Sequence, residues 1–173
     1  MAVALKYLEK ARMSAIELPR LQGKTILQVI PELSAGGAER TTIEVAEAVV
    51  EAGGWPIVVS EGGRLVKELE RVGGLHVSLP VRAKNPITVR NNAGKLARLI
   101  RAKSVDLIHA RSRAPAWSAY WAAQRTGIPF VTTYHGAYSG MSGLKRKYNS
   151  IMARGDLVIA NSEWTAAHVL SVH

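Results

Sequence analysis

The chain has 173 residues, a hydrophobic content of 47% and a formal net charge of +10, which suffices for one sizeable core and suits a single domain. It contains no cysteine, so disulfides, thiolate zinc sites and cysteine nucleophiles are excluded. No apolar run approaches the roughly 18 residues of a membrane-spanning helix, and charges interrupt the amino terminus too early for a secretory signal, so we expect a soluble cytoplasmic protein.

The positive charge is concentrated in the second half of the chain. Residues 82–154 contain 14 Lys and Arg residues and a single acidic residue, Asp106, whereas residues 1–81 contain 9 basic and 10 acidic residues. This distribution indicates an anionic partner, such as nucleic acid, a membrane surface or a phosphorylated saccharide. A surface whose charge serves only solubility is the alternative.

The first predicted element is a short amphipathic helix over residues 2–17, within an amino-terminal arm of residues 1–22. Leu5, Leu8 and Ile16 recur at roughly helical spacing, with basic residues between them. We expect this helix to pack on the domain; contact with a membrane interface is the alternative.

Strands and helices alternate through residues 23–173. Strands are predicted at 25–30, 55–60, 75–79, 105–110, 128–134 and 157–161, and helices at 38–52, 65–72, 85–103, 115–126 and 144–154. This alternation predicts an α/β fold, a doubly wound parallel sheet of Rossmann-like type with helices on both faces.

The last predicted helix starts at Ser162, a residue type that caps helices. It reaches His173 without a glycine or proline to end it. We therefore expect residues 23–173 to be a truncated Rossmann-like domain, with a natural short chain as the alternative.

In an open parallel sheet, ligands bind beyond the carboxyl ends of the strands. After the first strand, Gly36 and Gly37 precede a helix, where bare backbone N–H groups assist phosphate binding. The alternative is that these glycines only form a tight turn. After the fifth strand stands His135, and a neutral histidine suits a hydrogen bond to a sugar hydroxyl; a strand-end histidine without a role is the alternative.

The fourth strand is followed by Arg111, Ser112 and Arg113. Arginine forks bind phosphate or carboxylate groups bidentately, so this loop is a candidate for an acidic substituent on an acceptor. A solvated charge pair is the alternative. We expect His109, one residue inside the strand, to be a hydrogen-bonded core residue and not a ligand.

Several other chemistries lack their sequence signals. The dinucleotide fingerprint, the P-loop, the serine-hydrolase elbow and the Asp-x-Asp metal grip are all absent, and the histidines are scattered. We therefore expect neither a metal nor another cofactor. Nucleic acid is the least favoured partner, because Phe130 is the only phenylalanine and no recognition helix is evident.

Four segments together resemble the amino-terminal domain of family-four glycosyltransferases: ILQVIPELSAGGAERTTIEVAEAV, VDLIHARS, FVTTYHGAY and DLVIANSEWT. They span residues 24–170 in the family's order and spacing, and GGAER is the most specific. The resemblance implies the acceptor-side half of a GT-B fold, in which two Rossmann-like domains face a cleft. It also implies transfer of a hexosyl unit from a nucleotide-sugar, with retained anomeric configuration and usually without metal.

The resemblance implies roles for the candidate residues. Gly36 and Gly37 would lie near the donor diphosphate, and His135 would be the catalytic residue that positions hydroxyl groups without acting as a nucleophile. The residues expected to face the acceptor are Arg111, Ser112, Arg113 and Tyr134.

The family's carboxyl-terminal donor domain, with its paired glutamates, has no counterpart in this sequence, so we expect the isolated chain to be inactive. A strongly basic acceptor domain resembles members that act on lipid-linked or lipopolysaccharide acceptors of the cell envelope. This favours a peripheral position on the inner face of the cell membrane. The alternative function is a non-catalytic module that binds anionic glycans or lipids.

Overall fold

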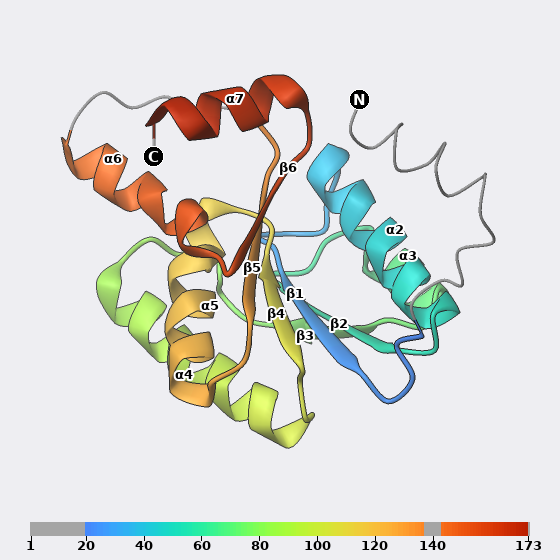
Figure 1. Ribbon diagram of the computed structural model, residues 1–173. Helices are drawn as coiled ribbons and strands as arrows, with labels where there is room; N and C mark the ends of the chain where they lie inside the picture. The colour runs from blue at the N-terminus through green and yellow to red at the C-terminus, as the bar shows by residue number, and fades with distance from the viewer. Residues whose placement is uncertain (1–19, 137–142, 173) are drawn as a thin grey trace.

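Six parallel strands form one sheet in the order β3-β2-β1-β4-β5-β6 (Figure 1). This computed structural model describes residues 20–136 and 143–172. The strands are β1 (Thr25–Val29), β2 (Trp55–Ser60), β3 (Leu75–Ser78), β4 (Leu107–Ala110), β5 (Phe130–Tyr134) and β6 (Leu157–Ala160). The helices are α2 (Gly37–Glu51), α3 (Val66–Arg71), α4 (Pro86–Ala102), α5 (Arg113–Thr126), α6 (Gly143–Asn149) and α7 (Glu163–Val172). The predicted doubly wound Rossmann-like fold is confirmed.

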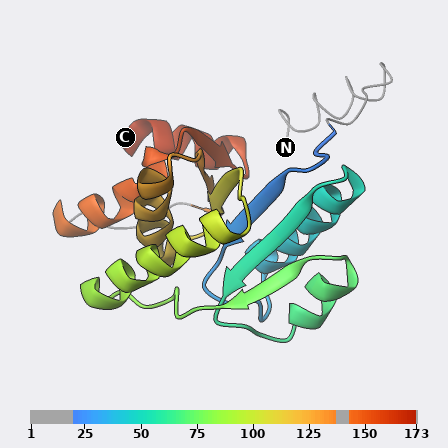
Figure 2. The ribbon, with the colours of Figure 1, turned by 90° about the horizontal axis from the view of Figure 1, so that it is seen from below.

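Helices cover both faces of the sheet, with α4 and α5 on one side and α2 and α3 on the other (Figure 1). Figure 2 shows the same arrangement from below. The central strands are buried on both faces, which is why they are continuous apolar runs. In β2, Ile57 and Val59 pack on the α4–α5 side while Val58 packs on the α2–α3 side.

Two aspartates tie neighbouring strands together at their amino ends. Asp106, before β4, accepts a hydrogen bond from the Thr25 N–H at 2.8 Å and returns one from its own N–H to the Thr25 carbonyl at 2.9 Å. Asp156, before β6, makes the same exchange with Phe130 at 2.8 Å in both directions. The backbone hydrogen bond from Thr25, followed by the side-chain hydrogen bond from Lys24, lowers the pKa of Asp106. The repeated Asp-Leu start of these strands therefore fixes which strand each one adjoins.

Most element boundaries differ from the prediction by one or two residues, and two of the differences have a clear physical reason. Helix α5 begins at Arg113 and not at Pro115, because proline is compatible with the first turn of a helix, where its missing N–H has no partner to lose. The predicted helix 144–154 ends as α6 and continues as a 3₁₀ turn, Ser150–Arg154. This tighter turn buries Ile151 and Met152 fully.

The predicted amino-terminal helix, residues 2–17, lies outside the described residues. Within the described part of the chain, no helix combines the length and apolar character needed to cross a bilayer.

Helix ends follow the sequence signals. Gly53 and Gly73, after α2 and α3, have φ angles of 82° and 88°, the left-handed conformation expected of glycine caps. Asn85 caps α4 by accepting a hydrogen bond from the Thr88 N–H at 2.8 Å, and Pro86 occupies the first helical position. Ser162 caps α7 through its hydroxyl oxygen, as predicted.

Replacing the cap of α4 will test its contribution to stability. We expect Asn85→Ala to lower the free energy of unfolding by about 1 kcal/mol, because the Thr88 N–H loses its acceptor. Asn85→Asp, which keeps an acceptor oxygen, is the control and should be nearly neutral. Urea denaturation measures both, and equal stabilities of Asn85→Ala and the parent chain would contradict the assigned cap.

Candidate active site

The carboxyl ends of the strands meet at one rim of the sheet, and the strand order reverses there between β1 and β4, the usual place for a ligand in this fold. A hollow of about 490 Å³ opens at this rim between α2 and strands β4 to β6. We call it the rim hollow; its lining includes Gly37, Thr41, His109, Arg111, His135 and Asn161. The glycine loop and the strand-end histidine therefore border the same hollow.

Arg111 is the only cation among the residues that line the rim hollow, and it is buried, with 4% of its surface exposed. Its guanidinium donates to Gln28 Oε1 at 3.2 Å and to Thr41 Oγ1 at 2.5 Å. Gln28 is itself fixed, because its amide donates to the Thr42 carbonyl at 3.0 Å. Three elements, β1, α2 and β4, thus hold one guanidinium.

The charge of Arg111 has no ionic partner within the described residues, since none of the ion pairs there includes it. Its Nε is buried and has no hydrogen-bond acceptor in the described part of the chain. Burial lowers the pKa of Arg111 to about 10, partly opposed by Glu44, so the side chain is cationic at neutral pH. A buried cation held by neutral oxygens is a candidate binding site for an anion.

Two histidines lie beside this cation, and both are neutral at neutral pH. His109 hydrogen-bonds through Nε2 to Thr133 Oγ1 at 2.7 Å, as expected of a core histidine. Burial is the main cause, and the charge of Arg111 the second, that lowers the pKa of His109 to about 3 and that of His135 to about 4. The Nε2 of His135 is buried and has no hydrogen-bond partner among the described residues. His135 can therefore form a hydrogen bond with a ligand group.

Asn161, after β6, fixes the backbone of His135. Its amide donates to the His135 carbonyl at 3.2 Å, while its Oδ1 accepts a hydrogen bond from the Thr165 hydroxyl at 2.9 Å. Thr165 is buried in the first turns of α7 and also bonds to Ser162. The ends of β5 and β6 and the start of α7 are therefore linked at one wall of the hollow.

The two glycines of the first loop have different structural demands. Gly36 caps α2 with a φ of 152°, and a β-carbon there would collide with the Glu39 carboxylate. Gly37 lines the rim hollow, and a β-carbon on it would meet no atom of the described residues within 4 Å. Gly36 is thus required by the backbone, whereas Gly37 leaves space for a ligand beside the helix.

The predicted acceptor residues do not all reach the rim hollow. Ser112 and Arg113 line a second hollow of about 610 Å³, together with Lys84, Lys145 and Tyr148, which we call the cationic hollow. Tyr134 is 2% exposed and packs in the core on the α4–α5 side of the sheet. Its placement follows from the alternation of side chains along β5, which turns Thr133 and His135 to one face and Tyr134 to the other.

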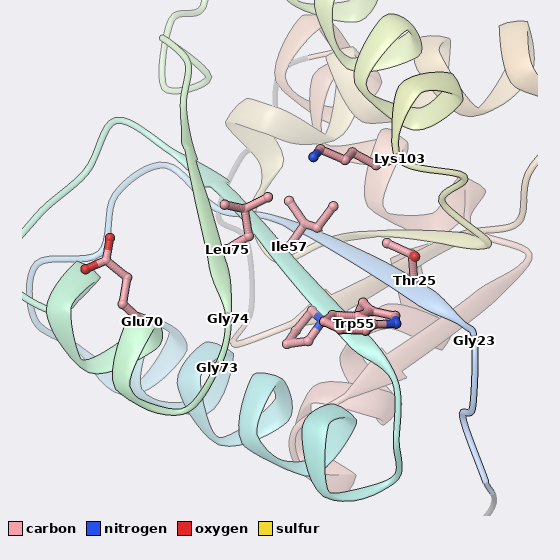
Figure 3. Close-up of a pocket in the computed structure, with 10 residues that line it drawn as sticks. Gly23, Thr25, Trp55, Ile57, Glu70, Gly73, Gly74, Leu75 and Lys103 are labelled. Carbon is pink, nitrogen blue, oxygen red and sulfur yellow. The ribbon is translucent and has the colours of Figure 1, made fainter.

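A third hollow, of about 640 Å³, lies at the opposite edge of the sheet, at the amino ends of β1, β2 and β3. Figure 3 shows Trp55, Ile57 and Leu75 on two neighbouring strands, with Lys103 reaching over from the end of α4. Trp55 is 65% exposed and Leu75 is 44% exposed. This hollow is mostly apolar and is separated from the rim by the length of the strands.

The structure also bears on metal binding. Within residues 20–136 and 143–172, no group of three or more His, Asp or Glu side chains is arranged to hold a metal ion.

Comparison with known proteins agrees with this geometry. The model of the family described as Glycosyltransferase Family 4 matches residues 35–173, most of the chain. The chain belongs to glycosyltransferase family 4. The match includes the glycine loop, Arg111 and His135. No curated protein matched the chain.

Several solved structures share the fold. A glycosyltransferase from Rickettsia africae has 47% identity and a TM-score of 0.75, over 85% of this chain and 39% of that one. Anabaena Alr3699/HepE in complex with UDP-glucose has 20% identity and a TM-score of 0.68, over 86% and 40%. Acinetobacter baumannii MurG has 15% identity and a TM-score of 0.64, over 82% and 42%. The last two show the fold alone, and the family-four chain spans about two fifths of each structure's length.

Sequence reasoning did not identify three residues that shape the rim hollow. Gln28 interrupts the apolar run ILQV of β1. A polar residue at such a position indicates a buried hydrogen-bond partner, but the sequence does not show which residue that partner is. Thr41 gave no signal, because threonine is common on helix surfaces. Asn161 follows β6 as His135 follows β5, so its position at the rim was inferable from the alternation of strands and helices.

The two neutral histidines predict how stability depends on pH. Because their folded pKa values lie below the ordinary 6.5, the unfolded chain binds protons that the folded chain does not, and stability is lost as the pH falls from about 6.5 towards 4. We expect His109→Gln to show a smaller loss between pH 7 and pH 5, measured by urea denaturation at each pH. An unchanged loss in His109→Gln would contradict the buried neutral state.

Proposed function

We propose that this chain is the acceptor-side domain of a glycosyltransferase that moves a hexosyl unit from a nucleotide-sugar to a glycan or lipid-linked acceptor. One observation carries the proposal: the buried Arg111 guanidinium, whose hydrogen-bond partners among the described residues are neutral, lies in the same hollow as Gly37 and His135. A diphosphate supplies the missing anion, and a sugar attached to it supplies hydroxyl groups for the imidazole.

In this proposal Arg111 and the start of α2 bind the donor diphosphate. The guanidinium is fixed before the ligand arrives and lies in a site of low dielectric, where it stabilises the charge that develops on the leaving diphosphate. Gly37 lets the diphosphate approach the backbone N–H groups of the helix. The complex of Anabaena Alr3699/HepE with UDP-glucose supports a nucleotide-sugar as donor.

His135 positions a hydroxyl group of the reacting sugars. During transfer, the bond from the anomeric carbon to the diphosphate breaks and the accepting hydroxyl oxygen bonds to that carbon. A neutral imidazole with a free Nε2 can hold such a hydroxyl without forming a covalent bond to the sugar. We propose retention of the anomeric configuration, as in the family that this chain resembles.

The rest of the donor site is proposed to come from a second domain. The chain spans 39% of the Rickettsia glycosyltransferase. A facing domain would close the hollow over the nucleotide. We therefore propose that residues 20–172 alone do not transfer sugar.

The outer surface of α4 supports a peripheral position on the cytoplasmic face of the membrane, with an acceptor of the lipopolysaccharide type. This helix has no acidic residue and exposes Arg90, Lys95, Arg98 and Arg101. At about 1 kcal/mol for each cation near an anionic surface, such a face is sufficient for reversible docking.

Donor binding tests the role of Arg111. We expect Arg111→Gln to weaken the binding of UDP-glucose by about tenfold or more, since a hydrogen bond to a charged group contributes about 1.5–3 kcal/mol. Arg111→Lys keeps the charge without the planar fork and should lose less. Calorimetric titration of the complete gene product measures both, with thermal melting to show that each variant is folded.

The outcome of this titration separates the two candidate functions. If the parent protein bound anionic vesicles but none of the UDP-, GDP- or ADP-sugars, a non-catalytic module for anionic glycans or lipids would replace the glycosyltransferase proposal.

Turnover tests the role of His135. We expect His135→Ala to reduce kcat for sugar transfer at least about tenfold, because positioned hydrogen-bonding groups typically contribute that much or more. The Kd for UDP-glucose should change little, since Arg111 and the helix bind the diphosphate. His109→Gln, at the neighbouring histidine that bonds to Thr133, is the matched control. Equal kcat values for His135→Ala and the parent would remove the assigned role.

A further inference from the structure

The cationic hollow has a composition that the donor site does not explain. Its cations come from three different elements: Lys84 precedes α4, Arg113 begins α5 and Lys145 belongs to α6. None of the lining residues that the structure describes is acidic. These elements lie far apart in sequence and come together on one side of the molecule (Figure 1). Three like charges at one concave site repel one another, and a bound anion relieves that repulsion.

Hydrogen-bond donors other than the cations also line this hollow. Arg113 is oriented by a 2.8 Å bond from its Nη1 to Asn149 Oδ1, and Asn149 is buried. Burial raises the pKa of Tyr148, partly opposed by Arg113, so its phenol is protonated and can donate. Ser112 caps α5 without using its side chain as the cap, so its hydroxyl is not committed to the helix. The hollow therefore presents charged and neutral donors to the same space.

We propose that the cationic hollow binds the phosphate group of a phosphorylated acceptor saccharide. Its volume of about 610 Å³ is in the range of small-molecule sites. Guanidinium, ammonium, phenol and hydroxyl groups are the donors that recognise a phosphate monoester. A neutral saccharide would not offer the negative charge that these cations attract.

The position of the hollow indicates the acceptor and not the donor. Arg111 lines the rim hollow, whereas Ser112, the next residue, lines the cationic hollow, and consecutive α-carbons are about 3.8 Å apart. A phosphate bound on one side of this connection places the remainder of a saccharide within reach of the other side. This assignment rests on the proposed function, because it requires the rim hollow to hold the donor.

An anionic bilayer is the competing ligand for a basic surface. A bilayer contacts outward faces, and the exposed cations on α4 form such a face. The cationic hollow is instead concave and combines its charges with an oriented arginine and a buried asparagine. Its chemistry fits a discrete phosphate group, either on a soluble sugar phosphate or on the saccharide of a lipid-linked acceptor.

Two charge-matched double variants of the complete gene product test the proposal. Lys84→Gln with Lys145→Gln removes two cations from the hollow, and Lys67→Gln with Arg71→Gln removes two exposed cations from the region of α3. The probes are glucose 6-phosphate, uncharged glucose and UDP-glucose in calorimetric titrations, and phosphatidylglycerol vesicles, with and without a phosphorylated glycolipid, in co-sedimentation. Melting temperatures show whether each variant is folded.

We expect the hollow variant to bind glucose 6-phosphate about tenfold or more weakly than the parent, as the loss of charged contacts implies. The α3 variant should bind glucose 6-phosphate as the parent does. Uncharged glucose should bind neither variant better than it binds the parent. The affinity for UDP-glucose should be the same in the parent and in both variants. If soluble glucose 6-phosphate binds through the hollow, the phosphate alone is recognised; if only phosphorylated glycolipid in vesicles does, the lipid-linked source is identified.

Three outcomes would overturn the proposal. Equal weakening in both variants would show binding by overall charge. Loss of phosphatidylglycerol vesicle binding in the hollow variant, with glucose 6-phosphate binding intact, would make the hollow a membrane contact. An absence of phosphate binding by the parent from every probe would remove the site. Failure of the parent to bind any of the UDP-, GDP- and ADP-sugars would instead contradict the proposed function, and the donor titrations measure that separately.

Discussion

The rim of this sheet depends on one buried guanidinium that neutral oxygens hold in place. A charge removed from water is costly unless it is hydrogen-bonded or paired. Here Gln28 of β1 and Thr41 of α2 supply acceptors for Arg111, which follows β4. The same contacts join the two strands at which the sheet order reverses. These contacts thus satisfy some of the guanidinium's hydrogen-bond donors and leave its charge available to an anion.

This cation also reinforces the neutral state of the histidines around it. Burial disfavours the imidazolium form, and the Arg111 charge adds to that effect, so His109 and His135 are both neutral near pH 7. The site therefore combines one fixed positive charge with neutral imidazoles. That combination separates two tasks, because a charge binds a diphosphate and a neutral ring forms hydrogen bonds with hydroxyl groups.

The connection from β4 to α5 separates the two hollows. Arg111 still follows the course of the strand and turns towards α2, whereas Arg113 is already the first residue of a helix on the opposite face of the sheet. A short connection between a strand and its crossover helix must cross the rim, so its side chains are divided between the two faces. In the proposed function, this geometry would place the groups that bind donor and acceptor next to each other.

The sequence by itself determined the fold and the location of the site. Apolar runs, glycine caps and the Asn85-Pro86 start fix the strands and helices, and the alternation of strands and helices then brings Gly37, Arg111 and His135 to one rim. Only the tertiary structure decided which residues share a hollow. Arg111 meets Gln28 across 83 positions of sequence, Arg113 lines one hollow with Lys84 and Lys145, and Tyr134 turns into the core. Periodicity reports how each residue is buried within its own element, whereas these contacts depend on strand order and on which helix covers which face, and both are set by packing between distant segments.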